Sequence, residues 1–296
     1  MVPELRLVRY FVAVAEERNI TRAAERLHIS QPALSAAVRQ LEQQLGVDLL
    51  DRSDRVLAVT PAGMVLAEEG RALLAAADRV FESVRARDGA AVGRLRMGMS
   101  PTARYGVGAE LLSASAAQAS GVMLYPHEDT TGALLHDVRS GRLDLAVLFC
   151  APSGFEGVEL EPLRDEPAVV HLRADHPLAG RPALALEELA GETLLVAESV
   201  ESGGFTSRVL ELFAAHGLAP ETRPDPYPDL GLQAVRDGLG VVVYVRSAFP
   251  GDVPGSAFVP VAPVVTFPFS LAWRAGPRSA ALDAVLAVAR GLKRAR

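Results

Sequence analysis

Residues 20–45 contain two short amphipathic patterns that a brief polar interruption separates. The first begins at Thr21, a residue type suited to a helix N-cap, and ends at Leu27. Ser30 then suits the N-cap of a second helix, and Pro32 lies in its first turn, where a missing N–H removes no hydrogen bond. The sequence therefore predicts two short helices joined by a tight turn.

The second of these helices has two distinct faces. Its apolar face recurs at spacings of four, three and four residues, through Leu34, Val38, Leu41 and Leu45. The opposite face presents Gln31, Ser35 and Arg39, whose amide, hydroxyl and guanidinium groups suit the reading of base edges in the major groove of DNA. The pattern is typical of a DNA-binding helix-turn-helix; a plain helical hairpin with a solvated polar face is the alternative.

Length and composition restrict the other classes. A chain of 296 residues that is 49% hydrophobic suits two or three domains with sizeable cores. It has no uninterrupted apolar run of about 18 residues, so we expect no membrane span. The amino terminus enters an amphipathic pattern directly, without the features of an export signal, which predicts a cytoplasmic location. The one cysteine, Cys150, cannot form an intramolecular disulfide.

The charge balance of the amino-terminal region is neutral. The whole chain has a net charge of −6, but residues 1–60 hold eight arginines and eight acidic residues. This is a mild argument against DNA binding, because phosphate contacts dominate affinity. The arginines could still gather on one face, with Arg6, Arg22, Arg39, Arg52 and Arg55 toward DNA, and binding would then depend on the avidity of a dimer.

The segments around the helix-turn-helix complete a small domain over residues 1–60. A helix is predicted over residues 5–17, where apolar residues form a wide face. Residues 47–50 and 56–59 predict two short strands around a polar turn that contains Arg52 and Arg55. A two-stranded wing in this position would place both arginines beside phosphates or the minor groove. An ordinary solvated hairpin is the alternative.

A long helix follows over residues 61–88, with Thr60 as its N-cap and Pro61 at its first position. Its apolar residues have the spacing of a two-stranded coiled-coil seam: Leu66, Leu73, Ala77, Val80 and Val84. We favour a dimer through this helix, because a two-fold DNA reader must span two half-sites. Packing against its own domain is the alternative. Small residues at 89–93 form a hinge before the next domain.

Residues 94–296 alternate between strand-like and helix-like patterns, which predicts a mostly parallel sheet flanked by helices. The expected strands cover residues 95–99, 122–125, 143–149, 168–172, 193–197, 240–245 and 267–273. The expected helices cover residues 102–118, 131–140, 204–216, 229–237 and 279–290. We divide them into lobe I, about 94–163 and 267–296, and lobe II, about 164–266. Two such lobes suggest a hinged module with a small-molecule cleft at the strand ends.

No catalytic set or metal site emerges from the sequence. The six histidines are scattered and include no His-x-x-x-His pair, and Ser202 lacks the Gly-x-Ser-x-Gly elbow of a nucleophile. Residues 127–129, His-Glu-Asp, are better explained as a solvated loop than as ligands of one ion. Cys150 ends a buried strand and is more simply a core residue than a nucleophile. We therefore expect neither an enzyme nor a cofactor.

The whole chain resembles the LysR-type transcriptional regulators. The segments that carry the resemblance are Phe11–Glu16, Ala23–Leu27, Ser30–Ser35, Leu41-Glu42 through Leu45-Gly46, Thr60–Gly63, Gly141–Ala146 and Asp237–Val241. The resemblance implies an all-α winged helix-turn-helix domain with a long linker helix, followed by an α/β two-lobed effector domain like the periplasmic binding proteins. It also implies a dimer or tetramer that binds double-stranded promoter DNA, responds to a small-molecule effector and contacts RNA polymerase.

The resemblance assigns roles to individual residues of the first domain. It places Ser30, Gln31, Pro32, Ser35 and Arg39 at the start of the helix that enters the major groove. It places Thr21 and Arg22 near the DNA backbone. Two departures reduce the expected phosphate and base contacts: Ala36-Ala37 stands where relatives often have Arg-Gln, and Gln40 stands where Arg is common. Weaker non-specific binding with a shallower salt dependence is the expected result.

For the effector cleft the resemblance indicates a set of segments. They contain Ser100, Pro101, Thr102, Thr130, Thr131, Ser199, Ser202, Gly203, Phe205 and Tyr227. Free N–H groups at helix starts receive carboxylates well, so we expect a small anionic effector, with Arg104 and Arg246 as candidate counter-charges. Each Ser or Thr could instead be only an N-cap. A small-molecule binding protein whose first domain serves dimerisation and has lost DNA binding is the alternative function.

Overall fold

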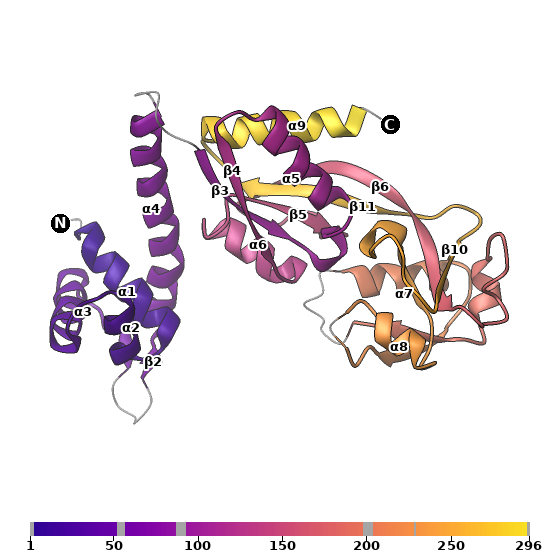
Figure 1. Ribbon diagram of the computed structural model, residues 1–296. Coiled ribbons are helices and arrows are strands. Elements are labelled where there is room, and N and C mark those ends of the chain that lie inside the picture. Colours follow the sequence, from indigo (N-terminus) through magenta and orange to yellow (C-terminus); the bar gives the residue numbers. More distant parts are fainter. Residues whose placement is uncertain (1–2, 52–56, 87–92, 198–203, 228, 295–296) are drawn as a thin grey trace. The chain divides into compact units, whose positions relative to one another are not determined.

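The computed structural model describes residues 3–51, 57–86, 93–197, 204–227 and 229–294 (Figure 1). By their internal contacts the residues form two compact units. The first contains Met1–Ala91 and the short segment Ser140–Arg142, and the second contains Val92–Arg139 and Leu143–Arg296.

The first unit is built on three short helices, α1 (Leu5–Glu17), α2 (Ile20–Arg26) and α3 (Gln31–Leu45). Phe11, Leu34 and Leu41 are fully buried in their shared core. Removing an aliphatic or aromatic side chain of this size from water contributes about 1.5–3 kcal/mol. The apolar stripe predicted on the second helix of the pair is therefore confirmed, and it holds the three helices together.

The N-cap predicted for α3 is confirmed, and the N-cap predicted for α2 is wrong. Thr21 was expected to cap α2, and this is wrong: the side chain of Asn19 accepts a hydrogen bond from Arg22 N at 3.1 Å. Asn has the short polar side chain that an N-cap needs, and it lies one position before the helix. Ser30 caps α3 as predicted, accepting from Ala33 N at 3.4 Å.

A short antiparallel pair, β1 (Leu50–Asp51) and β2 (Ala58–Val59), follows α3. The buried carboxylate of Glu42 accepts hydrogen bonds from Leu49 N at 3.0 Å and Leu50 N at 3.1 Å. This side chain therefore ties the start of the strand pair to α3. The turn predicted between the strands, with Arg52 and Arg55, lies outside the described residues.

The long helix α4 (Pro61–Ala86) begins as predicted, with Thr60 Oγ1 accepting from Gly63 N at 3.0 Å. A side chain at Gly63 would collide with the carbonyl oxygen of Leu49, so only glycine lets α4 approach the strand pair so closely. Farther along, Gly70 packs against Val8 of α1. One side of α4 thus packs on its own unit.

Some residues of the predicted coiled-coil seam of α4 pack against the first unit, and others are exposed to solvent. Leu66 is half-buried against the helical core, whereas Leu73 and Val80 are 47% and 60% exposed. Phe81, outside the predicted seam, is 58% exposed. The side chain of Val84 and the hinge residues before 93 lie outside what the structure describes.

A seven-stranded sheet organises the second unit (Figure 1). Its strands are β3 (Gly93–Met99), β4 (Val122–Glu128), β5 (Leu145–Phe149), β6 (Val158–Arg173), β9 (Val242–Val245), β10 (Ser256–Pro260) and β11 (Thr266–Arg274). They lie in the order β10-β6-β11-β5-β3-β4, and β9 also pairs with β6. The expectation of a mostly parallel sheet is wrong: only β3, β4 and β5 run parallel, and the other pairs in this sheet are antiparallel.

Strand β6 is longer than the sequence indicated. A strand was expected only over residues 168–172, but the observed strand covers 16 residues, Val158–Arg173. Its first part pairs with β11 as far as Pro167, and its second part pairs with β9 and β10. Charged residues and two prolines in the first part hide the alternation that marks a strand. The lobe boundary that we placed after residue 163 therefore falls inside one continuous strand.

The remaining elements of the second lobe are short. They are β7 (Thr193–Val196), β8 (Glu221–Pro224), α7 (Phe205–Ala215), α8 (Leu232–Arg236) and the 3₁₀ turns Leu186–Leu189 and Arg246–Ala248. Strand β7 runs parallel to β8. The helix expected over residues 229–237 is only five residues long. Strands β8 and β10 were not predicted, because their residues show little alternation of apolar and polar types.

Helices α5 (Val107–Gln118), α6 (Thr131–Arg139) and α9 (Ala280–Arg294) accompany the first-lobe strands. One continuous helix over 102–118 was expected, and this is wrong. A 3₁₀ turn occupies Pro101–Ala103, and α5 starts only after Gly106. A side chain at Gly106 would lie 2.6 Å from the Cβ of Ser247, so the break in the helix lies at a close contact between the two lobes.

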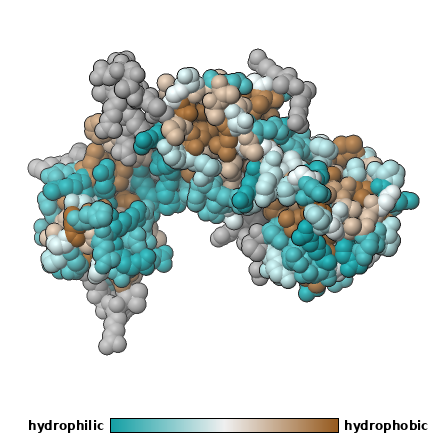
Figure 2. Space-filling model, viewed as in Figure 1, coloured by the Kyte–Doolittle hydropathy of each residue, from teal (hydrophilic) through white to brown (hydrophobic). Residues whose placement is uncertain are grey.

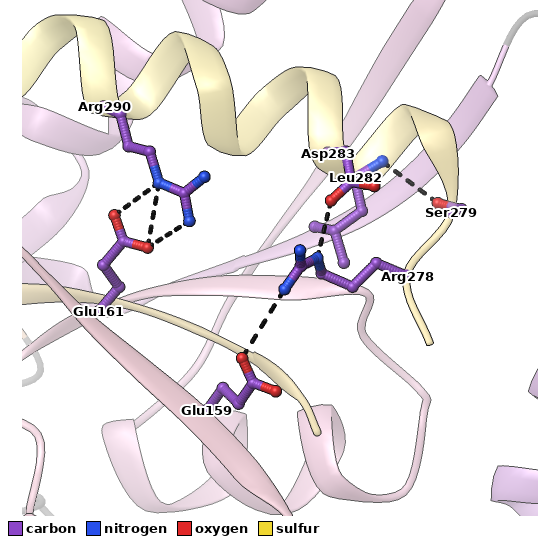
Figure 3. A network of polar contacts seen from close by, with 7 residues as sticks. All are labelled: Glu159, Glu161, Arg278, Ser279, Leu282, Asp283 and Arg290. Carbon is purple, nitrogen blue, oxygen red and sulfur yellow. Dashed lines mark hydrogen bonds and ion pairs between the residues drawn. The ribbon is translucent and has the colours of Figure 1, made fainter. Parts of the chain in front are cut away.

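Ion pairs fix α9 to the central strands (Figure 3). The guanidinium of Arg290 binds both carboxylate oxygens of Glu161 on β6, with Nη2 to Oε2 at 2.6 Å. This contact lowers the pKa of Glu161. Before the helix, Arg278 Nε donates to Asp283 at 2.7 Å, and Ser279 Oγ accepts from Leu282 N at 3.2 Å. The helix is thus held both at its start and along its length.

Hydrophobic residues on the face drawn in Figure 2 gather over α5 and α9. Four of the twelve residues of α5 are alanine. Among the described residues, no helix combines the length and the apolar character needed to cross a membrane.

A buried histidine makes the stability of the second unit depend on pH. His171 is fully buried beside Phe258, and burial lowers its pKa to about 4. The unfolded chain takes up this proton near pH 6.5, so the free energy of unfolding should fall by about 3 kcal/mol as the pH is lowered from 6.5 to 4. Urea denaturation at several pH values measures this, and His171→Gln should remove that part of the slope. Equal slopes in the two proteins would contradict the assignment.

Candidate functional site

The polar face of α3 is open to solvent. Gln31, Pro32 and Arg39 are exposed and Ser35 is half-buried. Gln31 Nε2 donates to Ser35 Oγ at 3.3 Å, which shows that both side chains lie along one line of the helix. The structure therefore brings together the residues that the sequence predicted for the major groove, on the side of α3 opposite its buried leucines.

An ion-pair cluster lies beside α2. Arg22, expected near the DNA backbone, is paired with Glu17 at 3.1 Å, and Arg26 with Glu16 at 2.8 Å. Glu16 also binds Arg71 of α4 at 3.0 Å. Thr21 and Ser30 are exposed. A phosphate has to compete with the Glu17 carboxylate for the Arg22 guanidinium, which reduces the net gain only slightly because the Arg22 side chain is 69% exposed.

A cavity of about 470 Å³ opens in the second unit, a volume in the range of small-molecule sites. Seven of the ten residues predicted for the effector cleft line it: Ser100, Pro101, Thr102, Thr130, Thr131, Phe205 and Tyr227. The other three, Ser199, Ser202 and Gly203, lie outside the described residues. The seven come from both lobes, so the cavity lies between them.

The first-lobe wall provides hydrogen-bonding groups. Thr130 caps α6 by accepting from Ala133 N at 3.3 Å, and Thr131 Oγ1 donates to the carbonyl of Phe149 at 3.3 Å. Since the first amides of a helix have no partner within it, the N–H groups of Thr131 and Gly132 stay available at the positive end of α6. Ser100 is 2% exposed, and its Oγ has no hydrogen-bond partner among the described residues.

Aromatic rings form a large part of the remaining surface. Phe149 of β5 packs on Phe205 at the start of α7, with ring centroids 4.9 Å apart. Phe205 in turn stacks on Tyr244 of β9 at 4.5 Å. All three rings line the cavity and are buried. Burial raises the pKa of Tyr244 far above its ordinary value, so its phenol stays neutral.

Sequence reasoning missed one functional candidate in the wall, Asp225. It directly follows β8, a strand that the sequence did not predict, and it lies more than 90 positions from Thr131 in the chain. Burial is the main cause that raises the pKa of the Asp225 carboxyl group, and the nearby charge of Asp229 raises this pKa further. Hydrogen bonds from backbone amides act in the opposite direction and lower the pKa. One of these bonds comes from Tyr227 N at 3.1 Å. A prediction of strand β8 would have been needed to recognise Asp225 as a residue at the end of a strand and hence as a candidate for the cavity.

The expected counter-charges are not in this wall. Arg104 pairs with Glu128 at 3.4 Å and lies over the ring of Tyr105. Arg246 lies over Phe258, 4.3 Å from the ring centroid, and lines a different cavity. The assignment of both arginines to the effector cleft is therefore wrong.

A metal site requires several ligands close together, and a reactive thiol requires its ionised form. No three His, Cys, Asp or Glu residues gather there in a way that could hold a metal ion. Cys150 is 5% exposed, and burial raises the pKa of its thiol to about 12. Such a thiol carries almost no reactive thiolate at neutral pH.

Comparison with known families accounts for both units. Residues 5–64 match the family model described as "Bacterial regulatory helix-turn-helix protein, lysR family", and residues 88–293 match that of the "LysR substrate binding domain". The chain belongs to the LysR family. LysR regulators pair a helix-turn-helix domain with a two-lobed α/β domain, and both are present in this chain.

Relatives support the same assignment over different lengths. The chain is 33% identical over 291 residues to the Hca operon transcriptional activator HcaR of Escherichia coli, with 96% of each chain covered. It is 36% identical over 195 residues to the hydrogen peroxide-inducible genes activator of Dickeya chrysanthemi, covering 66% of this chain and 63% of that one, so it spans less than two thirds of that relative. A full-length OxyR from Pseudomonas aeruginosa has a similar structure, with a TM-score of 0.75, 30% identity and coverage of 98% and 95%.

The buried thiol leads to a chemical test. At pH 8 iodoacetamide should react with Cys150 in the folded chain on the order of a thousandfold more slowly than in the chain unfolded in urea, because the thiolate fraction is that much smaller. Mass spectrometry of the alkylated protein over time measures both rates. Comparable rates in the two states would show that the thiol is accessible and ionised, contrary to this structure.

Proposed function

We propose that this LysR-family chain is a transcriptional regulator that binds promoter DNA through α3 and responds to a small molecule in the cavity between its lobes. The exposed line of Gln31, Ser35 and Arg39 on a capped, well-packed helix carries the proposal, because these groups match the donors and acceptors of base edges. The names of the relatives, which describe activators of genes and operons, support it. The site residues are those predicted from sequence, with Asp225 added.

The assembly is part of the proposal. Leu73 and Val80 form an apolar strip on α4 that its own unit leaves exposed, which supports a dimer through this helix. A dimer suits a pseudo-palindromic site, and two dimers would form a tetramer. We also propose the following domain divisions: the winged helix-turn-helix domain at 1–60, the linker helix at 61–88, the hinge at 89–93 and the effector domain at 94–296.

An effector would act through the relation between its two lobes. A ligand that touches both stabilises the conformation that it fits best and so shifts the population of states. That change would reach the DNA as an altered bend and would raise or lower transcription, with RNA polymerase as a further partner. The proposed location is the cytoplasm, and the proposed role is regulatory rather than enzymatic.

The signal is proposed to be a ligand rather than peroxide. Several relatives are named for hydrogen peroxide, but this sequence has one cysteine, and its thiol is buried with a raised pKa. One thiol cannot close an intramolecular disulfide, and a protonated thiol reacts slowly with oxidants. The cavity offers a direct alternative route for a signal.

A small-molecule binding protein without DNA function is the second candidate. Ala36, Ala37 and Gln40 are the observation in its favour, since they leave Arg39 as the one cationic side chain within α3. Arg22 and Arg26 are also paired with Glu17 and Glu16, so a phosphate has to compete with these carboxylates for both arginines.

Footprinting across a range of salt concentrations separates the two candidates. We expect the purified protein to protect a dyad-symmetric site on successive helical turns in the DNA upstream of its own gene. Protection should weaken as the salt concentration rises, but less steeply than for a DNA-binding domain with more arginines on its recognition helix. If the folded, dimeric protein protects nothing at low salt, and random-site selection also recovers no sequence, the DNA function is wrong and the binding-protein candidate stands.

Single substitutions test the face of α3. Gln31→Ala should weaken preference for the correct base about 5- to 150-fold, the loss expected for about 1–3 kcal/mol of base contact, while the free energy of unfolding changes by less than about 0.5 kcal/mol. Competition binding with mutated sites measures the preference. Glu25→Ala, an exposed change on α2, serves as the control. An unfolded Gln31→Ala protein would contradict the outward orientation of this side chain.

A further inference from the structure

The described cavity wall contains one carboxylate, that of Asp225, and no cationic side chain. Of the twenty described residues that line it, Asp225 alone has an ionisable acid or base other than the neutral phenols of Tyr227 and Tyr244. Asp229 and Asp237 lie close by: Asp229 raises the pKa of Asp225, and Tyr227 donates its hydroxyl to Asp237 at 3.3 Å. The second-lobe side of the cavity is therefore electronegative.

The first-lobe side offers hydrogen-bond donors, and the one carboxylate directly before α6, that of Asp129, accepts from Thr130 N at 2.7 Å. Helix α6 is nine residues long and begins at Thr131 on the cavity wall, with the Thr131 and Gly132 amides available. Ser100 beside it is 98% buried, and its hydroxyl has no partner in the described chain. A buried hydroxyl without a partner is costly unless a ligand or water completes its hydrogen bonds. This end suits a carboxylate, which accepts from several donors at once.

Between the two ends the wall is apolar. The rings of Phe149, Phe205 and Tyr244 are in mutual contact, and β7 contributes Leu194 and Leu195. This surface can cover an aliphatic or aromatic body and gives it no hydrogen bonds. The order of the three surfaces is thus donors from lobe I, an apolar centre and a carboxylate from lobe II.

We infer that the effector is a zwitterion of the amino-acid class with an apolar or aromatic side chain, whose carboxylate binds at the start of α6 and whose ammonium group binds Asp225. The inference rests on the proposed effector function of this cavity and specifies the ligand. A purely anionic ligand would meet the Asp225 carboxylate without a compensating cation, and a purely cationic one would leave the Ser100 hydroxyl and the α6 amides unpaired. A zwitterion satisfies both lobes and links them.

Asp225 also has a local structural role, which the ligand does not replace. Its Oδ1 accepts from Tyr227 N, and a backbone bond from Gly231 holds it in the turn after β8. A carboxylate offers about four acceptor positions, so two remain for an ammonium group. Asp225→Asn retains an acceptor for the turn but removes the charge, which makes it a suitable test variant.

Calorimetric titration of the full-length protein with matched probes tests the inference. The probes are L-phenylalanine, L-tyrosine, L-tryptophan, L-leucine, L-isoleucine, L-valine and L-methionine, each with its deaminated acid and its decarboxylated amine. At least one amino acid should bind tenfold or more tightly than both of its matched compounds. Asp225→Asn should abolish that advantage, whereas the deaminated acid should bind at least as tightly as it does to the unchanged protein, because the repelling carboxylate is gone. Asp252→Asn, the control, removes an exposed carboxylate of the same lobe that does not line the cavity and should retain the advantage.

Other outcomes overturn the inference. If no amino acid exceeds its matched acid and amine, or if Asp225→Asn binds the preferred amino acid as tightly as the unchanged protein, the effector is not of this class. Footprinting on the same preparation keeps the two hypotheses apart. Protected DNA with no preference for zwitterions leaves the regulator function standing, whereas zwitterion binding without protected DNA supports the ligand class alone.

Discussion

The backbone ladder of β6 is the interaction on which the second unit depends. One strand of 16 residues pairs with β11 in lobe I and with β9 and β10 in lobe II, so the two lobes share a single set of backbone hydrogen bonds. Where the partners change, Pro167 stands in β6, and Pro268 faces Asp165 from β11. Proline donates no ladder hydrogen bond, so the sheet has fewer backbone hydrogen bonds at the point where the lobes join.

Side chains reinforce the strand on both sides of that point. Arg290 of α9 binds Glu161, and Arg164 bridges Glu110 of α5 and Glu166 at 2.8 Å each. Ser247 of lobe II donates to Glu166, which links the second lobe to the same network. Because Gly106 lets the first lobe come within contact of Ser247, the lobes touch beside the strand as well as through it. Any bending at β6 would therefore rearrange these charged contacts.

The cavity follows from this arrangement of lobes. Two of its polar groups, Ser100 and Asp225, come from different lobes, and the aromatic contact between Phe149 and Phe205 also joins the lobes. A ligand that binds groups of both lobes favours one relation between them, and its affinity for that state sets how far the population shifts. Chemical selectivity and conformational response thus arise from the same few side chains.

Much of the first unit was determined by local sequence. The cap at Ser30, the proline in the first turn of α3, the stripe of Leu34 and Leu41 and the cap at Thr60 all act within a few residues, where helix physics leaves little choice. The polar face of α3 follows, since a helix that buries one side must expose the other. The wrong prediction of Thr21 as the cap of α2 also concerns a local choice, because Asn19 and Thr21 are both residue types that can cap the same helix.

The second unit shows what local pattern leaves open. Sequence determined the alternation of strands and helices, the two-lobed class and seven residues of the cavity wall. Tertiary structure alone decided that β6 runs unbroken through two prolines, that the chain breaks at Gly106, and that Asp225 faces the same cavity as Ser100. The reason is that these features depend on contacts between residues far apart in the chain, and neither periodicity nor propensity within a short window records such contacts.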